Sequence, residues 1–247
     1  MKPTLKLAHC SDIHLDYEYY GGDRNLHLHD YYRDLFGKLL DDVRTATPDL
    51  LLLAGDLFDH NRAAEPTVNW TMEMLGKMPF PVVMIPGNHD CLTENGIYLR
   101  HDFNVIPNVT LLDQEHGQTV ELADLSLRVW GKGMIDHTPE NQPLRGMPEQ
   151  LNGGQWHVGM GHGIPVATGV ACMNSSPIHE AQIDASEFDY LALGHLHAMR
   201  DVSTTQTPAF FCGAPGPIQE DHGTWLMTTL EEGQPVDVQR IELDLNR

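Results

Sequence analysis

Residues 50–59, LLLLAGDLFD, constrain the fold more than any other stretch of this chain. Four leucines and an alanine lead directly into Gly55 and Asp56, and Asp59 follows. A short apolar run that ends in turn residues is typical of a strand buried on both faces, as in an α/β domain. Open α/β sheets bind ligands at the carboxyl ends of their strands. Asp56 is therefore expected at a rigid site on that edge.

The length and composition of the chain limit its domain organisation and its cellular location. A chain of 247 residues with 41% hydrophobic content can bury a sizeable core. It shows no repeats and no convincing linker, so the prediction is a single domain over 1–247 without a separate capping domain. The start, MKPTLKLAHC, is too short and polar for a signal peptide, and no apolar stretch is long enough to span a membrane. A cytoplasmic protein is predicted.

The charged and sulfur-containing residues narrow the function classes. The formal net charge is −20, and the 15 Lys and Arg residues are dispersed without a basic run, so a broad electrostatic footprint for duplex nucleic acid is absent. The four cysteines form no CxxC pair and are predicted to be free thiols. They are Cys10, Cys91, Cys172 and Cys212. The 15 histidines suggest metal binding, because histidine is the commonest metal ligand.

The hydrophobic pattern alternates between strands and helices in the first third. Strands are predicted at 5–9, 50–54 and 82–85, with a long loop at 16–30 and helices at 31–45 and 64–78. This order indicates a parallel α/β unit. Further strands are expected at 109–112, 119–122, 125–130, 157–161 and 190–193, a proline- and glycine-rich loop at 138–154, and antiparallel strands at 209–212, 224–230 and 236–243.

Polar side chains follow five of these apolar segments. They are Asp12, His14, Asp56, Asn88, His89, His162, His195 and His197. In extended chain, residues two apart lie on the same side, so each DxH or HxH pair offers two ligands to one site. Carboxylate, amide oxygen and imidazole together suit Mn²⁺, Fe²⁺ or Zn²⁺. Since the candidate ligands exceed the needs of one ion, Asp56 is expected to bridge two ions that clamp a phosphoryl group.

Each piece also has a purely structural interpretation. Asp12 and His14 resemble a strand-end cap or surface pair, while Asp56 and Asp59 could cap helices. Asn88 fits the left-handed position of a turn, and a single His162 is typical of a structural histidine. The joint occurrence of all the pieces, each at a strand end, favours the metal site.

These blocks resemble the complete signature of the calcineurin-like metallophosphoesterases. The blocks are Asp12-x-His14, Gly55-Asp56-x-x-Asp59, Gly87-Asn88-His89-Asp90, Gly161-His162 and Gly194-His195-x-His197. Five longer segments are similar to those of the SbcD-type DNA repair exonuclease branch and its phosphodiesterase relatives. They are SDIHLD, LLLAGDLFD, PVVMIPGNHD, FDYLALGHLH and CGAPGPIQED. The resemblance implies an α/β fold, a four-layer αββα sandwich of two mixed β-sheets flanked by helices.

The resemblance also implies roles for individual residues. The first ion would be held by Asp12, His14, Asp56 and His197, and the second by Asp56, Asn88, His162 and His195. His89 would face the scissile phosphate as general acid or transition-state stabiliser, oriented by Asp90, while Asp59 would support the Asp56 loop. Two divalent ions are implied, manganese first, with iron, zinc or magnesium as alternatives.

Two departures limit the resemblance. Full-length repair nucleases of this branch carry a capping region after the phosphoesterase domain, which is not expected here, and their clefts tend to be basic. The other histidines are interpreted as structural. They are His9, His27, His29, His60, His101, His116, His137, His157, His179 and His222. Of these, only His27 and His29, in the loop after the first metal block, are kept as further candidates for the site.

The resulting functional prediction is a dinuclear phosphoesterase that hydrolyses phosphodiester bonds through a metal-bridging hydroxide. The alternative is a phosphomonoesterase acting on nucleotides or phosphoproteins. A non-catalytic scaffold of the same fold would require a broken signature, above all at His89, and all blocks are intact. Small or single-stranded phosphodiesters are the expected substrates, with duplex DNA cut weakly or with a partner. No membrane partner is expected, and oligomerisation stays open.

Overall fold

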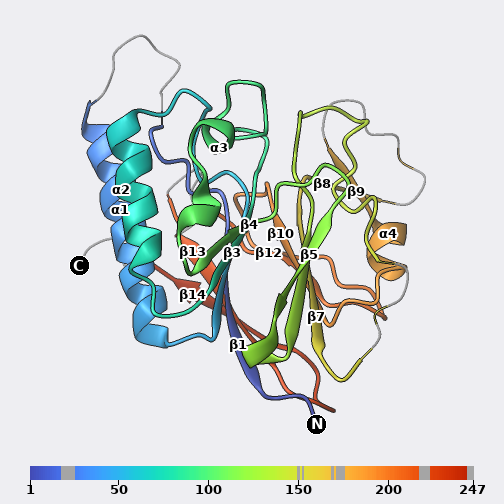
Figure 1. Cartoon of the computed structure of the whole chain (residues 1–247). Helices are drawn as coiled ribbons and strands as arrows, with labels where there is room; N and C mark the ends of the chain where they lie inside the picture. Colours follow the sequence, from blue (N-terminus) through green and yellow to red (C-terminus); the bar gives the residue numbers. More distant parts are fainter. Residues whose placement is uncertain are drawn as a thin grey trace.

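A computed structural model describes residues 1–17, 26–148, 151, 153–167, 170, 176–216 and 223–243, and for 26–29 the backbone alone. In this part of the chain two six-stranded sheets face each other (Figure 1). The first contains, in spatial order, β14 (Asp237–Glu242), β13 (Thr224–Leu230), β1 (Leu5–Cys10), β2 (Leu50–Ala54), β3 (Val82–Ile85) and β4 (Val109–Leu111). The second contains β11 (Arg200–Asp201), β12 (Ala209–Phe211), β10 (Tyr190–Gly194), β7 (Trp156–His162), β6 (Leu127–Gly131) and β5 (Gln118–Leu122).

Both sheets are mixed. Strands β1 to β4 are parallel, while β13 pairs antiparallel with β1 and β14 with β13. In the second sheet β12, β10, β7 and β6 are parallel, while β5 and β11 are antiparallel edge strands. A small sheet pairs β8 (Ile164–Val166) with β9 (Pro177–His179). The carboxyl ends of the parallel strands therefore collect at one edge of each sheet.

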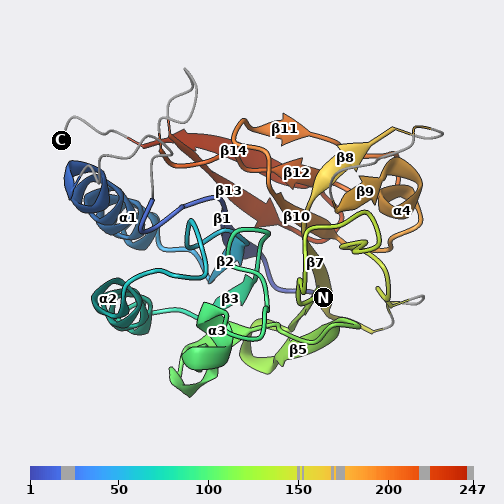
Figure 2. The same cartoon turned by 90° about the horizontal axis from the view of Figure 1, so that it is seen from above.

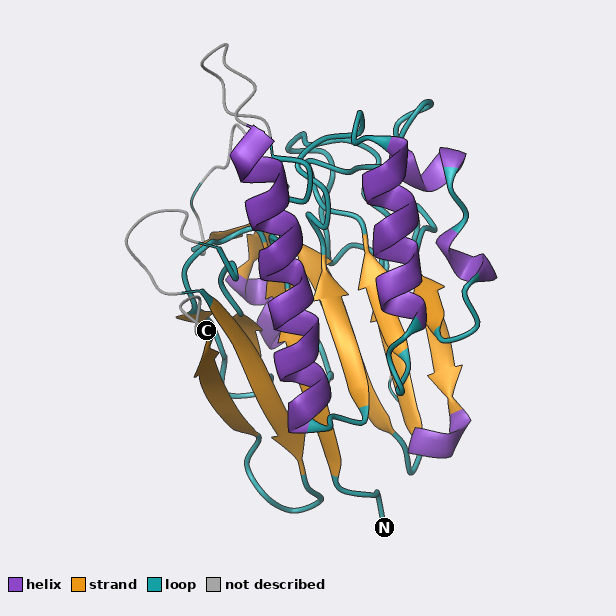
Figure 3. Cartoon of the chain, turned by 90° about the vertical axis from the view of Figure 1, so that its left-hand side faces the viewer, coloured by secondary structure: helices purple, strands orange, loops and turns teal. Residues whose placement is uncertain are grey.

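Helices complete the layers. They are α1 (Leu26–Ala46), α2 (Glu65–Gly76), α3 (Ile97–Arg100) and α4 (Glu180–Asp184). Figure 3 shows α1 and α2 lying side by side across the outer face of the first sheet. Seen from above, α4 lies beyond the second sheet, on the opposite side from α1 and α2 (Figure 2). The four-layer αββα sandwich is confirmed, although α4 makes its last layer thin.

Strand β2 shows why the sequence folds this way. Leu51 and Leu53 pack into the core beneath α1 and α2, while Leu50 and Leu52 pack into the core between the two sheets. All four are buried. A strand buried on both faces needs an uninterrupted apolar run, which this segment supplies. The position of Asp56 directly after it follows from that packing.

Three sequence-based predictions need correction. Helix α1 begins at Leu26, within the predicted loop 16–30, and the first turn of the helix shows no apolar period that could mark it in the sequence. Strand β12 pairs parallel with β10, not antiparallel as predicted for 209–212. The pattern of a buried strand carries no information about its direction. The short elements α3, α4, β8, β9 and β11 were missed because each is too short to show a period.

The other predicted segments agree with the structure. Helix α2 and the predicted strands recur within a few residues of their expected bounds, and the described part of 138–154 contains no helix or strand. Cys10, Cys91 and Cys212 are buried free thiols, as predicted. Cys172 and His222 lie outside the described residues, as do the side chains of His27 and His29.

Candidate metal centre

The predicted metal ligands meet where the two sheets present their carboxyl ends. Asp12 and His14 follow β1, Asp56 follows β2 and Asn88 follows β3, all in the first sheet. His162 ends β7, and His195 and His197 follow β10, in the second sheet. Each sheet thus supplies part of one centre.

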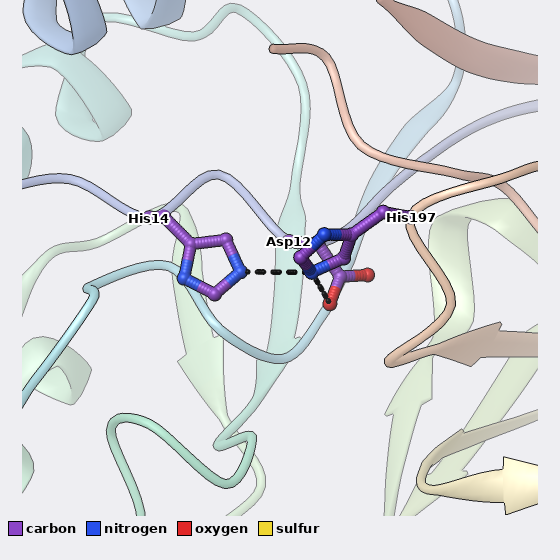
Figure 4. Close-up of side chains that lie close together, drawn as sticks. All are labelled: Asp12, His14 and His197. Atoms are coloured by element: carbon purple, nitrogen blue, oxygen red, sulfur yellow. Dashed lines mark hydrogen bonds and ion pairs between the residues drawn. The ribbon is translucent and has the colours of Figure 1, made fainter. Parts of the chain in front are cut away.

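The first cluster contains Asp12, His14 and His197 (Figure 4). The Nε2 atoms of His14 and His197 lie 3.2 Å apart, and Nε2 of His197 lies 3.7 Å from Oδ1 of Asp12. Asp12 and His14 are buried, whereas the His197 side chain is 33% exposed. The cluster therefore opens to solvent on the His197 side.

The second cluster is built around Asn88 and Asp56. Oδ1 of Asn88 lies 3.0 Å from Nε2 of His162 and 2.8 Å from Nδ1 of His195. Oδ2 of Asp56 lies 3.3 Å from Nε2 of His162 and 4.0 Å from Nε2 of His14. Asp56 thus lies between the two clusters and contacts a histidine of each.

The HxH and DxH pairs do not have the extended conformation predicted for them. His195 joins the second cluster and His197 the first, so the pair divides between the clusters. Asp12, His14 and His195 have φ values of 56°, 54° and 106°, so neither pair is extended chain. Asp56 also has positive φ, at 53°. Such conformations cost energy and concentrate at functional sites, where surrounding contacts hold them.

Two glycines permit the loops to approach this closely. A Cβ on Gly87 would overlap Oδ1 of Asp56, and one on Gly194 would overlap the carbonyl oxygen of Ala54. Neither the backbone nor the fixed site side chain has room to move away. The small residue before Asn88 and before His195 is therefore a steric requirement of the site.

The buried charges of the centre are coupled. Burial alone would raise the pKa of Asp56, but the adjacent His162, with His14 and His89, lowers this pKa well below its usual range. Burial opposes protonation of His162 as well, yet Asp56 raises the pKa of His162 to about 9. Imidazole must be deprotonated to bind a metal. Metal binding at the second cluster is therefore expected to release a proton.

His89 lies beside the clusters on the accessible side. Its side chain is 41% exposed, and its ring packs edge-on against His14 with centroids 4.7 Å apart. Its backbone N–H donates to Oδ1 of Asp56 over 2.8 Å, and its Nδ1 lies 2.6 Å from the carbonyl oxygen of Asp59. The ring is thus fixed with Nε2 left for a bound molecule.

Asp90 occupies a different place from the one expected. Its Oδ2 accepts hydrogen bonds from the backbone N–H groups of Leu57 and Phe58 and from the Tyr98 hydroxyl, and its Oδ1 accepts one from Gly87. No described hydrogen bond joins it to His89, and it is fully buried. The expectation that Asp90 orients the His89 ring is not supported by these contacts. Asp90 instead joins the loop after β2 to the loop after β3.

Asp59 contacts more residues of the site than the sequence indicated. Its Oδ1 lies 3.0 Å from Nδ1 of His14, and its carbonyl oxygen holds His89. It therefore orients one residue from each of two other loops. The Gly55-Asp56-x-x-Asp59 spacing could have suggested this, because a carboxylate behind a histidine ligand commonly fixes the ring tautomer.

The residues present fit two divalent ions. Oδ1 of Asp12 is buried and accepts no hydrogen bond from the described residues, which is costly unless a cation compensates it. Ligand atoms in three groups lie within 4.8 Å of one another: Asp12, His14 and His197; His14, Asp56 and His89; and Asp56, His162 and His195. Donor atoms 3–4 Å apart are spaced suitably for ions with bonds of about 2.0–2.2 Å. The oxygen and nitrogen donor set suits borderline divalent metals.

Comparison with known proteins agrees with this geometry. The model of the calcineurin-like phosphoesterase family matches residues 5–199. The chain belongs to this family. Among curated relatives, it is 24% identical over 217 residues to the SbcD component of nuclease SbcCD from Staphylococcus saprophyticus, covering 78% of this chain and 56% of that protein. It is 22% identical to the DNA double-strand break repair protein Mre11 of Methanopyrus kandleri, covering 98% of this chain and 58% of that protein. The chain thus spans less than two thirds of these relatives' length.

Solved structures support the fold. One crystal structure superposes with a TM-score of 0.62 at 12% identity, over 98% of this chain and 100% of the other. A novel archaeal phosphodiesterase superposes with a TM-score of 0.51 at 12% identity, over 97% and 100%. Within the described ranges, none of the helices combines the length and apolar character needed to cross a bilayer.

Proposed function

We propose that this chain is a dinuclear metal-dependent phosphodiesterase. The observation that carries the proposal is the position of Asp56, whose Oδ2 lies 3.3 Å from His162 and 4.0 Å from His14. A carboxylate placed between two clusters can serve an ion in each. When bound, two divalent ions supply a nucleophile from water and neutralise charge on a phosphoryl group.

The proposed ligand sets divide around Asp56. The first ion is held by Asp12, His14, Asp56 and His197, and the second by Asp56, Asn88, His162 and His195. The distances within the two clusters support this division. Manganese is the proposed metal, since a set containing carboxylate, amide oxygen and imidazole is neither purely soft nor purely hard.

His89 is the proposed proton donor to the leaving oxygen. Its Nδ1–H donates to the carbonyl oxygen of Asp59, so the ring keeps one orientation. A protonated ring then has its Nε2–H free for the substrate, and after transfer it is neutral without turning. A positioned acid of this kind contributes roughly 10²–10⁴-fold to rate. Asp90 acts indirectly in this proposal, by joining the loops that carry Asp56 and His89.

Small or single-stranded phosphodiesters are the proposed substrates. The net charge of −20 opposes long-range attraction of any polyanion. The centre itself can still attract one phosphate, because two divalent ions outweigh the charges of Asp12 and Asp56. Long duplex DNA requires rows of cations along its backbone, so we propose weak or partner-dependent action on it. A single domain over 1–247 and a cytoplasmic location complete the proposal.

The test is hydrolysis by the manganese-loaded chain of four substrates: a phosphomonoester, a small phosphodiester, and end-labelled single- and double-stranded DNA. The proposal expects the small diester and single strand to be cut fastest, and His89→Ala to abolish most of each activity while retaining metal. Preference for the monoester would establish the phosphatase alternative. Absence of turnover on every substrate in a fully loaded chain would favour a scaffold.

A further inference from the structure

The loop after β6 also reaches the metal centre, although none of the sequence blocks covers it. Strand β6 is parallel to β7, and β7 to β10, so the end of β6 lies at the same sheet edge as His162 and His195. The histidine of this loop, His137, was interpreted from the sequence as structural. Its ring packs edge-on against His195 with centroids 5.4 Å apart.

His137 faces the centre without joining the ligand clusters. Besides its neighbour Asp136, the ionisable groups that interact electrostatically with it include the site residues His162, Asp56, His89 and His195. Its nitrogens are not among the ligand atoms that lie within 4.8 Å of one another. The residue therefore lies next to the second cluster without being one of its ligands.

One nitrogen of His137 lacks a partner. Its Nε2 is buried and makes no hydrogen bond to any described residue. A buried polar atom left unpaired destabilises the folded chain, so such atoms commonly await a ligand, an ion or water. An unpaired imidazole N–H beside a phosphoesterase centre suits an anionic oxygen.

The loop is held on both sides of His137. The backbone N–H of Leu92 donates to the carbonyl oxygen of Met134 over 2.7 Å, which joins the loop to the segment following His89. On the other side, Nζ of Lys132 lies 3.1 Å from the carbonyl oxygen of Gln142, and the Asn141 amide donates to the Ser176 hydroxyl over 2.9 Å. These contacts fix the backbone before and after His137 and favour a preorganised binding group.

We infer that His137 binds a non-bridging oxygen of the phosphoryl group on the side of the second cluster. Its role differs from that of His89, which donates a proton to the leaving oxygen. The inference rests on the proposed function, because that function places the phosphoryl group at the centre. His137 then contributes affinity for a phosphoryl anion and leaves metal binding unchanged. This gives the β6 loop a role in substrate binding.

The test uses inorganic phosphate as the probe and does not depend on turnover. Manganese-loaded wild type, His137→Ala and His137→Gln are titrated with phosphate by calorimetry, and metal content is measured on the same samples. His137→Ala is expected to bind phosphate about tenfold more weakly or worse, the usual effect of losing a hydrogen bond to a charged group. His137→Gln, which places an N–H near the position of Nε2, is expected to recover part of that affinity. His116→Ala, a change at an exposed histidine before β5, is the matched control.

The outcomes separate this inference from the proposed function. Equal phosphate affinity in wild type and His137→Ala overturns the inference, as does loss of an ion in His137→Ala, which would make the residue a support for metal. A loaded wild type that binds no phosphate also overturns it. A wild type that binds phosphate through His137 but hydrolyses no phosphoester upholds the inference and removes the proposed function.

Discussion

Oδ1 of Asp59 lies 3.0 Å from Nδ1 of His14, on the side of the imidazole away from the first cluster. This contact holds the Nδ1–H tautomer and leaves the Nε2 lone pair for an ion. Asp59→Ala is therefore expected to weaken metal binding at the first cluster by about 10–100-fold. Calorimetric titration with Mn²⁺ measures this, with Asp41→Ala as the control because Asp41 is an exposed carboxylate. Unchanged affinity would mean that packing alone orients His14.

Asp56→Asn is expected to impair both metal sites. One carboxylate lies against a histidine of each cluster, so its replacement by a neutral amide removes charge from both ions at once. Metal analysis of the purified variant should show fewer than two ions per chain, against two for wild type. The matched control is Asp113→Asn, a carboxylate outside both clusters. Two tightly held ions in Asp56→Asn would contradict a shared ligand and with it the dinuclear proposal.

His89→Ala and His162→Ala are expected to fail in different ways. His89 is 41% exposed beside the clusters, and its loss should leave both ions bound while kcat falls about 10²–10⁴-fold. His162 is buried within the second cluster, and its loss should remove an ion. Parallel measurements of kcat and metal content decide the roles. Similar metal content in the two variants would show that the assignment is wrong.

The sequence predicted that most of these side chains would lie together because each of them follows a regular strand. Once residues 50–54 are assigned to a strand buried on both faces, Asp56 must stand at its carboxyl edge, and the same holds for Asn88 after β3. For Asp56 and Asn88, the local sequence pattern and the position of the strand in the sheet lead to the same prediction. That agreement is why the sequence alone predicts one shared site for residues far apart in the chain.

The errors arose where a contact crosses between loops. The positive φ values of Asp12 and His14 depend on the surrounding loops and leave no trace in the spacing of the two residues. The Asp90 carboxylate turns toward four donors that only the fold brings to it. His137 is interpreted from the sequence as structural because a lone histidine in an irregular loop has no periodicity to mark it. Each case concerns a residue whose neighbours in space lie on other segments of the chain.

His9 is expected to make stability depend on pH. It is fully buried with its Nδ1 2.9 Å from the Tyr190 hydroxyl, and burial lowers its pKa from 6.5 to about 3. Because the folded-state pKa is the lower one, this contribution to stability is complete above pH 6.5 and is lost as the pH falls toward 3. With these values, His9 alone makes the chain roughly 1 kcal/mol less stable at pH 5.5 than at pH 7.5.

Urea unfolding of wild type and His9→Asn at both pH values, with chelator present, measures this contribution. The asparagine keeps a polar group near Tyr190, so the variant is expected to lose the His9 part of the pH dependence whatever its overall stability. The remaining histidines are common to both proteins, and His116→Asn serves as the control for an exposed site. Equal pH dependence in wild type and His9→Asn would show that His9 can be protonated in the folded chain.

Duplex DNA is expected to bind weakly to the metal-loaded chain, with a shallow dependence on salt. Each phosphate neutralised by a lysine or arginine contributes a slope of about −0.9 in log affinity against log salt concentration. The 15 basic residues are scattered among 35 acidic ones, so the expected slope corresponds to about one or two phosphates. Titration of a long labelled duplex over a salt series measures it, with a single strand of the same sequence for comparison. Tight binding with a slope of about −6 or steeper would reveal a basic groove assembled from distant residues, and the chain would then act as a duplex nuclease without a partner.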